Sequence, residues 1–140
     1  MTPHQIADLV ARGHSVGNHT LSHTNLRELS HDDLEREIGE SARKISSWTG
    51  KPVDAFAWPF SWDAVNPHAW EVIRQHHRYC FAPCPGVVDS RVDVPTLIWR
   101  REVEVRYSSE ELRFQYSGLV DLVWATRRWR LRRLLGESTG

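Results

Sequence analysis

Segments typical of helices alternate with short apolar segments along this chain of 140 residues, and this order constrains the fold more than any other feature. Proline and glycine mark the helix ends, since proline suits the first turn and glycine the position just after the last. Helices are expected over residues 3–12, 31–49 and 67–77, and strands over 14–18, 53–58, 78–82 and 96–99, with one more at 103–105. Strands that alternate with helices pair in parallel. The sequence therefore predicts an α/β fold with a mainly parallel sheet or barrel.

A single helix is expected to close the chain. It begins with the capping-box pattern of Ser108 and Glu111 and ends near Leu135. Its apolar positions keep helical phase through a glycine, and they are Leu112, Leu119, Val120, Val123 and Trp124. A chain of this length suits one hydrophobic core. We therefore predict a domain over residues 1–107 and, packed on it, a C-terminal helix over 108–140 with a basic end.

The overall charge argues against a nucleic-acid partner, because 18 basic and 18 acidic side chains give a formal net charge of zero. Five arginines nevertheless gather between Arg127 and Arg133. Two interpretations of this basic end stay open: peripheral contact with an anionic glycan or lipid headgroups, or complementation of the helix dipole. No apolar run approaches the ~20 residues of a transmembrane segment and no signal peptide is evident, so cytoplasm and cell envelope both stay open.

Two histidines give the strongest indication of chemistry. His19 and His23 are four residues apart, so on one helical turn their imidazoles would share a face and could bind one divalent ion. The alternative is a hydrogen-bonded pair with a structural role. The flanking residues favour the first interpretation, because the segment reads Gly13-His-Ser-Val-Gly-Asn-His19-Thr-Leu-Ser-His23.

That segment closely resembles the histidine motif of NodB-type polysaccharide deacetylases. The resemblance continues in register. Residues 56–61 read Phe-Ala-Trp-Pro-Phe-Ser where the family often reads Phe-Ala-Tyr-Pro-Phe-Gly, and residues 97–103 are similar to its closing strand. Together these segments cover residues 2–105. The resemblance implies an incomplete NodB-type distorted β/α barrel with a long C-terminal helix.

The resemblance also implies roles for matching positions. His19 and His23 match the histidine ligands of a divalent metal, usually zinc, whose bound water attacks an acetyl carbonyl. Phe60 matches the residue whose backbone N–H stabilises the oxyanion, and its alternative is a buried aromatic in a turn. The implied activity is hydrolysis of N-acetyl groups on a polysaccharide or oligosaccharide substrate. The competing hypothesis is an inactive carbohydrate-binding remnant.

One part of the family pattern has no counterpart in these residues. The family's aspartate pair, one a metal ligand and the other the general base, precedes the aligned segment. Aspartates encoded just before Met1 would favour the enzyme, and their absence would favour the remnant. Residues 1–140 alone are then expected to bind zinc weakly, to dissolve poorly and to deacetylate at a negligible rate.

Other titratable side chains are expected to be structural or solvated. Asp32 and Asp33 form a pair by sequence, but they fall in the first turn of a helix, where carboxylates face the helix dipole. The catalytic acid is unassigned, because the histidines after the proline turn are expected on the surface, and they are His68, His76 and His77.

Tryptophan is frequent, with seven residues, and aromatic faces both fill cores and stack on sugar rings. Three occupy core-facing helical positions, and they are Trp48, Trp70 and Trp124. Trp58 and Trp62 flank Pro59 at the expected mouth of the site. For these two, contact with the substrate and packing stay equally open.

Overall fold

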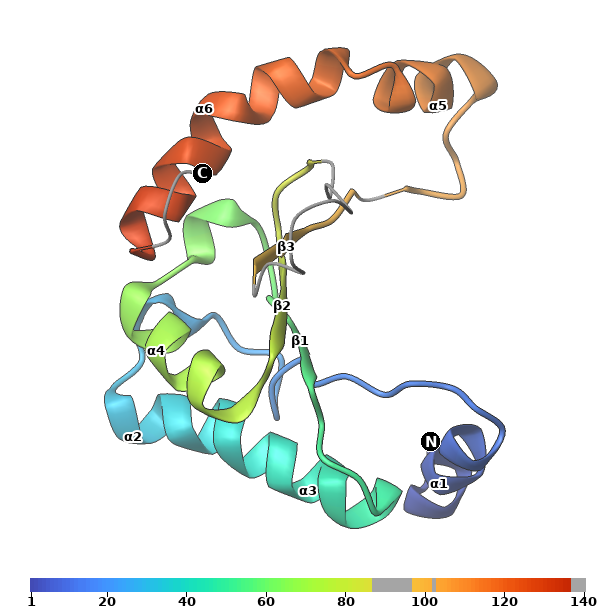
Figure 1. The fold of residues 1–140 in the computed structure, drawn as a ribbon, viewed down its shortest axis with the longest axis vertical. Coiled ribbons are helices and arrows are strands. Elements are labelled where there is room, and N and C mark those ends of the chain that lie inside the picture. The colour runs from blue at the N-terminus through green and yellow to red at the C-terminus, as the bar shows by residue number, and fades with distance from the viewer. Residues whose placement is uncertain (87–96, 102, 137–140) are drawn as a thin grey trace.

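The computed structural model describes residues 1–86, 97–101 and 103–136, and helices alternate with strands as predicted (Figure 1). The described strands are β1 (Ala55–Ala57), β2 (Tyr79–Ala82) and β3 (Leu97–Trp99). The α-helices are α1 (Pro3–Ala11), α2 (His31–Leu34), α3 (Ser41–Thr49), α4 (Pro67–His76), α5 (Ser109–Tyr116) and α6 (Leu119–Leu134). Shorter elements are the 3-10 turns η1 (Leu26–Glu28) and η3 (Trp62–Ala64) and the π-helical segment η2 (Glu35–Glu40).

The described strands form one parallel sheet in the order β1-β2-β3. Phe56, Cys80 and Leu97 align across it, and they are buried in one core cluster with residues of α2 and α4. Figure 1 shows these two helices on the same side of the sheet. Alternate positions such as Ala57 and Phe81 are half-buried. Among the described residues the sheet is open, so this α/β fold is an incomplete barrel.

The predicted helix ends are confirmed where capping residues specify them. The Thr2 hydroxyl accepts a hydrogen bond from the amide of Gln5, completing a capping box on α1. Asn66 caps α4 in the same way, with Pro67 in its first turn. Gly50 ends α3 with a left-handed φ of 67°, a conformation that costs glycine little.

The predicted helix over residues 31–49 is present, but its middle is π-helical. Within η2 the residues Glu37, Ile38 and Gly39 are buried. A Cβ atom on Gly39 would lie 2.6 Å from both Glu35 Oε2 and His76 Nε2, which contact each other at 3.0 Å. Any side chain at position 39 would therefore make Glu35 or His76 shift.

The predicted strand over residues 14–18 is wrong. Only Asn18 bridges to β1: its amide donates to the Ala55 carbonyl and its carbonyl accepts from the Ala57 amide, both at 2.8 Å. A strand needs a succession of such pairs. Residues 14 and 15 are exposed and have no ladder partner in the described part of the chain.

The segment 103–105 is also not a strand. The chain turns there, and the Tyr107 amide donates to the Glu104 carbonyl at 3.0 Å. Val103 and Val105 are exposed, so neither side chain supplies the burial that stabilises a strand. Thr96, at the start of the predicted strand over 96–99, lies outside the described residues.

The C-terminal segment is two helices rather than one. Gly118 has a left-handed φ of 84° and separates α5 from α6. This break changes the helical phase, so Leu119 and Val123 are exposed instead of buried. Leu131 and Leu135 join the core cluster. No described helix is long and apolar enough to cross a membrane.

Candidate functional site

A cleft of about 580 Å³ opens at the carboxyl ends of the strands. Its lining comes from the segment directly after each strand: Phe60–Trp62 after β1, Pro83 and Pro85 after β2, and Arg100 and Arg101 after β3. His19, His23 and Trp124 complete it. Parallel α/β sheets bind ligands at this edge, because the strand-end loops converge there. This cleft is the candidate site.

The two histidines lie in a loop, so the expected helical turn is wrong. Thr20 and His23 have left-handed φ angles of 70° and 57°. Local bonds replace helical ones, because the Thr20 amide donates to Asn18 Oδ1 and the His23 amide to Thr20 Oγ1, both at 3.0 Å. The loop still brings the imidazoles of His19 and His23 together, with ring centroids 4.9 Å apart.

One ring nitrogen of His19 is fixed by the backbone. Nδ1 lies 2.8 Å from the carbonyl oxygen of Ala57, the last residue of β1. A carbonyl can only accept, so Nδ1 carries the hydrogen and Nε2 keeps its lone pair. Proteins orient metal-binding histidines by this kind of contact. His19 therefore offers an oriented nitrogen ligand at the cleft.

Asn18 is 1% exposed and holds the histidine loop from beneath. Its Oδ1 accepts hydrogen bonds from the Thr20 amide, at 3.0 Å, and from Ser41 Oγ, at 2.8 Å. Its Nδ2 donates to the Ile38 carbonyl at 2.8 Å and lies 3.2 Å from His77 Nε2. One buried amide thus joins the loop, η2, α3 and the end of α4.

Glu37, which is 5% exposed, holds the other half of the loop. Its carboxylate accepts from the amides of Leu21 and Ser22, at 3.1 and 2.9 Å, and from Ser22 Oγ at 2.8 Å. Sequence reasoning missed this residue. The available signal was its position three residues after Leu34 and next to Ile38, on the apolar side of the predicted helix.

His77 was expected on the surface and is instead 5% exposed. As the C-cap of α4 it leaves helical geometry, and its ring lies against Phe56, with centroids 5.3 Å apart. Its Nδ1 donates to the Ile73 carbonyl, so Nε2 accepts from Asn18. Burial lowers the pKa of His77 from 6.5 to about 4. The ring is therefore neutral at pH 7.

This burial predicts acid sensitivity. Below pH 6.5 the unfolded chain binds a proton at His77 that the folded chain does not take up until about pH 4. The free energy of unfolding should therefore fall as the pH drops from 6.5 to 4, by roughly 3 kcal/mol. Chemical denaturation at several pH values measures the loss. In a His77→Gln variant this loss should be absent, and an equal loss in both proteins would contradict the assignment.

The proline turn places an aromatic ring beside the histidines. Phe60 has a left-handed φ of 60°, rare for a bulky residue, and its side chain is 49% exposed. Its ring centroid lies 4.9 Å from that of His23. The alternative of a buried turn aromatic is therefore wrong. Among the described residues, the Phe60 amide donates to no acceptor, which leaves a backbone N–H at the cleft for a ligand.

Two neighbours of Phe60 are packed inside. Trp58 is 1% exposed and meets Phe56 edge-on, with centroids 6.2 Å apart, and Pro59 is also fully buried. Trp58 therefore packs in the core, which is one of the two interpretations that the sequence left open for it. Trp62, by contrast, lines the cleft and is only partly buried.

An arginine of α6 lies between two tryptophans of the cleft. The Arg127 guanidinium carbon is 5.3 Å from the ring centroid of Trp62 and 4.4 Å from that of Trp124. Such contacts over aromatic faces are attractive. The stack connects α6 to the turn after β1.

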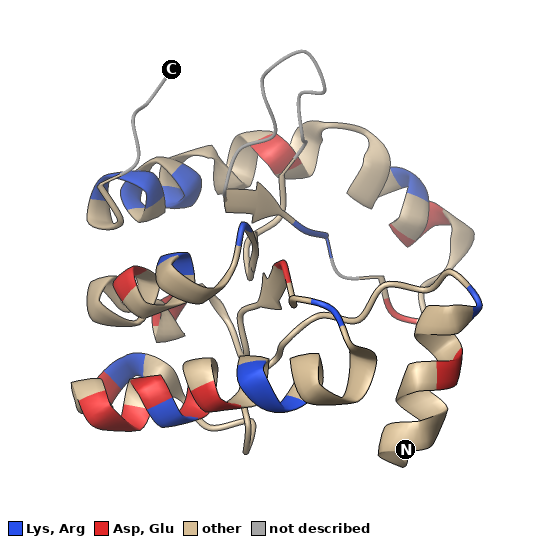
Figure 2. Ribbon diagram, turned by 60° about the horizontal axis from the view of Figure 1, so that its bottom comes forward, with Lys and Arg blue, Asp and Glu red and all other residues tan. Residues whose placement is uncertain are grey.

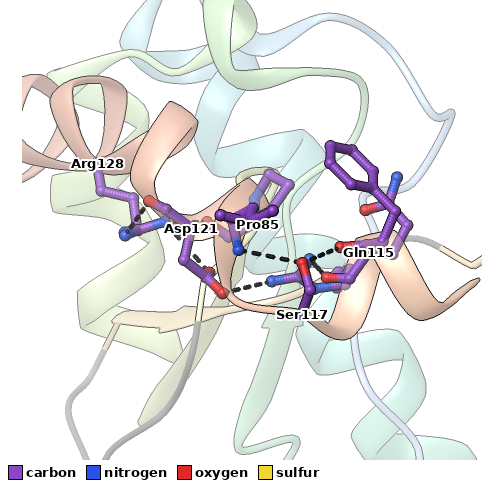
Figure 3. A network of polar contacts seen from close by, with 8 residues as sticks. Pro85, Gln115, Ser117, Asp121 and Arg128 are labelled. Atoms are coloured by element: carbon purple, nitrogen blue, oxygen red, sulfur yellow. Dashed lines mark hydrogen bonds and ion pairs between the residues drawn. The ribbon is translucent and has the colours of Figure 1, made fainter. Parts of the chain in front are cut away.

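Much of the basic end of α6, visible in Figure 2, has partners inside the chain. Arg128 donates to the carbonyls of Pro85 and Asp121, each at 2.8 Å. Arg101, after β3, donates to Asp121 Oδ2 at 2.9 Å, and Figure 3 shows this network. These bonds attach α6 to the loops that follow β2 and β3. Arg100 and Arg101 could have been found by sequence, because they directly follow a predicted strand.

The described ranges 1–86, 97–101 and 103–136 hold no group of three His, Cys, Asp or Glu placed to bind a metal. The histidine pair therefore has no third ligand within these ranges. Asp32 and Asp33 lie in the first turn of α2 as predicted. His68 is exposed, as expected, and His76 is half-buried against Glu35.

The sheet, the cleft at its carboxyl ends and the oriented histidine define an α/β protein with a candidate ligand site at its strand ends. The sequence profile of the family described as "Polysaccharide deacetylase" matches residues 1–79. This match covers more than half of the chain, which therefore belongs to the polysaccharide deacetylase family.

Solved structures share the fold. A polysaccharide deacetylase from Bacillus cereus has a TM-score of 0.67 at 22% identity, covering 82% of this chain and 36% of that one. A Streptococcus pyogenes deacetylase in complex with acetate has a TM-score of 0.67 at 19% identity, covering 82% of this chain and 50% of that one. The chain thus spans half or less of these structures. Among curated proteins, no sequence matches it.

Proposed function

We propose that this chain carries the histidine side of a metal-dependent site that hydrolyses N-acetyl groups on a polysaccharide. The observation that carries the proposal is His19, whose Nδ1–H is bonded to Ala57 while Nε2 is free beside His23. Metal-binding histidines are usually oriented by such a contact, and His19 lies at the ligand-binding edge of the sheet. A zinc ion held by these imidazoles would polarise the acetyl carbonyl and acidify a water molecule.

Other residues of the cleft suit the same chemistry. The unbonded amide of Phe60 could donate to the oxyanion that forms as the acetyl group is attacked. Trp62 offers an aromatic face on which a sugar ring could stack. The cleft volume of about 580 Å³ lies in the range of small-ligand sites. A volume of this size accommodates a few sugar units.

We propose further that residues 1–140 by themselves are slow or inactive. Catalytic zinc sites usually have three protein ligands, and the described residues bring together two. A positioned general base typically contributes ~10²–10⁴-fold, and no described carboxylate lines the cleft. The same observations favour a second candidate function, which is carbohydrate binding without hydrolysis.

Trp62→Ala tests whether the cleft binds glycans. With a neutral oligomer of N-acetylglucosamine, the substitution should weaken binding roughly tenfold, because a stacked aromatic is lost. Titration calorimetry measures the Kd. Trp129→Ala is the matched control, because Trp129 is exposed on α6 and does not line the cleft, so it should leave the Kd unchanged.

Acetate release during the same titrations separates the candidate functions. Release that needs zinc would support the deacetylase, and binding without release would support the carbohydrate-binding function. Equal weakening by both tryptophan substitutions would contradict binding in this cleft.

A further inference from the structure

We propose that the cleft binds glycans with anionic substituents, such as carboxylate, phosphate or sulfate groups, and that Arg100 and Arg127 contact these groups. The proposal rests on the proposed function, because it names the charge class of the glycan that occupies the same cleft. Two observations carry it. Arg100, in the lining, and Arg127, beside the lining, form no ion pair with a described carboxylate, and other contacts hold each guanidinium in place.

Arg100 directly follows β3, lines the cleft and is exposed. One of its nitrogens, Nη2, donates to the Trp58 carbonyl at 2.9 Å. A carbonyl fixes the guanidinium without neutralising it. Within the described part of the chain no carboxylate forms an ion pair with Arg100. With respect to the described residues, its remaining N–H donors and its charge are available to a ligand.

The guanidinium of Arg127 is held in place by aromatic rings that contact its faces. It lies over the rings of Trp62 and Trp124, both of which line the cleft. Stacking occupies the faces of a guanidinium and leaves its N–H edge free to donate. No described carboxylate pairs with Arg127 either. The N–H edge of this cation suits an anionic group on a bound glycan.

The other arginines at the cleft differ in this respect. Arg101 and Arg128 share the carboxylate of Asp121, with contacts of 2.9 and 3.6 Å. The acidic residue Asp63 adjoins the lining, and its carboxylate accepts from Ser61. No Asp or Glu is among the described residues that line the cleft. The charges that face a ligand are therefore mainly positive.

The test compares two N-acetylated tetrasaccharides: a neutral chitin fragment and a hyaluronan fragment, whose alternate sugars carry carboxylates. Binding to the 140-residue chain is measured by calorimetry at pH 8 with a chelator, so that neither imidazolium nor a bound cation contributes. At low salt the anionic fragment should bind about tenfold more tightly. Because exposed charges are screened, this preference should disappear as salt approaches 1 M.

Arg100→Gln and Arg127→Gln should each reduce the ratio of the two Kd values about threefold. Arg130→Gln is the matched control, because Arg130 is an exposed arginine of α6 that does not line the cleft and, among the described residues, stacks on neither Trp62 nor Trp124, so the ratio should stay the same. Equal Kd values for both fragments at low salt would overturn the proposal while leaving the proposed function intact. A preference reduced as much by Arg130→Gln would overturn it as well. Failure of both fragments to bind in the presence of the chelator and again in the presence of zinc would contradict the proposed function itself.

Discussion

His19→Ala is expected to reduce the affinity of the chain for zinc by roughly 100-fold or more. The substitution removes one of two imidazoles that lie together, and it is the one whose free nitrogen is oriented by Ala57. Loss of an orienting partner alone typically costs ~10–100-fold in metal affinity, so loss of the ligand should cost at least as much. Competition with a chromogenic zinc chelator measures the change.

His68→Ala is the matched control, because His68 is exposed on α4 and does not line the cleft. Its zinc affinity should equal that of the original chain. Nitrogen-15 spectra of the metal-free chain provide a second readout, because they should show His19 with its hydrogen on Nδ1. Zinc binding that survives His19→Ala but is lost in His68→Ala would place the metal elsewhere.

Asn18→Ala should lower the free energy of unfolding by about 3–5 kcal/mol. The substitution leaves three groups without their partner, which are the Thr20 amide, Ser41 Oγ and His77 Nε2, and it removes one of two donors to the Ile38 carbonyl. A buried polar group without a partner costs ~1–3 kcal/mol, and several cannot all be rehydrated when Asn18 is 1% exposed. Urea denaturation followed by circular dichroism measures the change.

Asn25→Ala is a control of the same chemistry. Asn25 caps η1 through one exposed hydrogen bond, which its Oδ1 accepts from the Arg27 amide at 3.0 Å. Loss of such a cap costs ~1 kcal/mol. A destabilisation by Asn18→Ala no larger than this would mean that the buried network contributes little to the fold.

Much of the fold could be predicted because short-range chemistry specifies it. Caps at Thr2, Ser30 and Asn66 and the left-handed glycine at position 50 mark helix ends within a few residues of sequence. Alternation of helix and strand then implies a parallel sheet. The failures have another origin. Residues 14–18 pair at one position alone, and pairing depends on neighbours far along the chain.

The sequence predicted that His19 and His23 lie close together, but it predicted a helical turn where the structure has a loop. Spacing of four residues suggested a helical turn, whereas Asn18 and Glu37 hold the segment as a loop. The second of these contacts is not local, since Glu37 lies 15 residues from Ser22. His77 became buried because α4 ends at His76 and the chain leaves helical geometry there. Gly118 ended a helix whose apolar spacing alone suggested continuation.

The π-helical segment η2 restricts insertions and deletions in its helix. A π-helical turn bonds each amide one residue farther back than an α-helical turn does, so it acts as an inserted residue. Deleting one residue from positions 35–40 would allow a regular α-helix in which Leu34 and Ala42 keep their phase, but the wide turn between them would be lost. Glu37 and Ile38 could then not both keep their contacts with the loop. Homologous chains should therefore rarely gain or lose a residue in this segment.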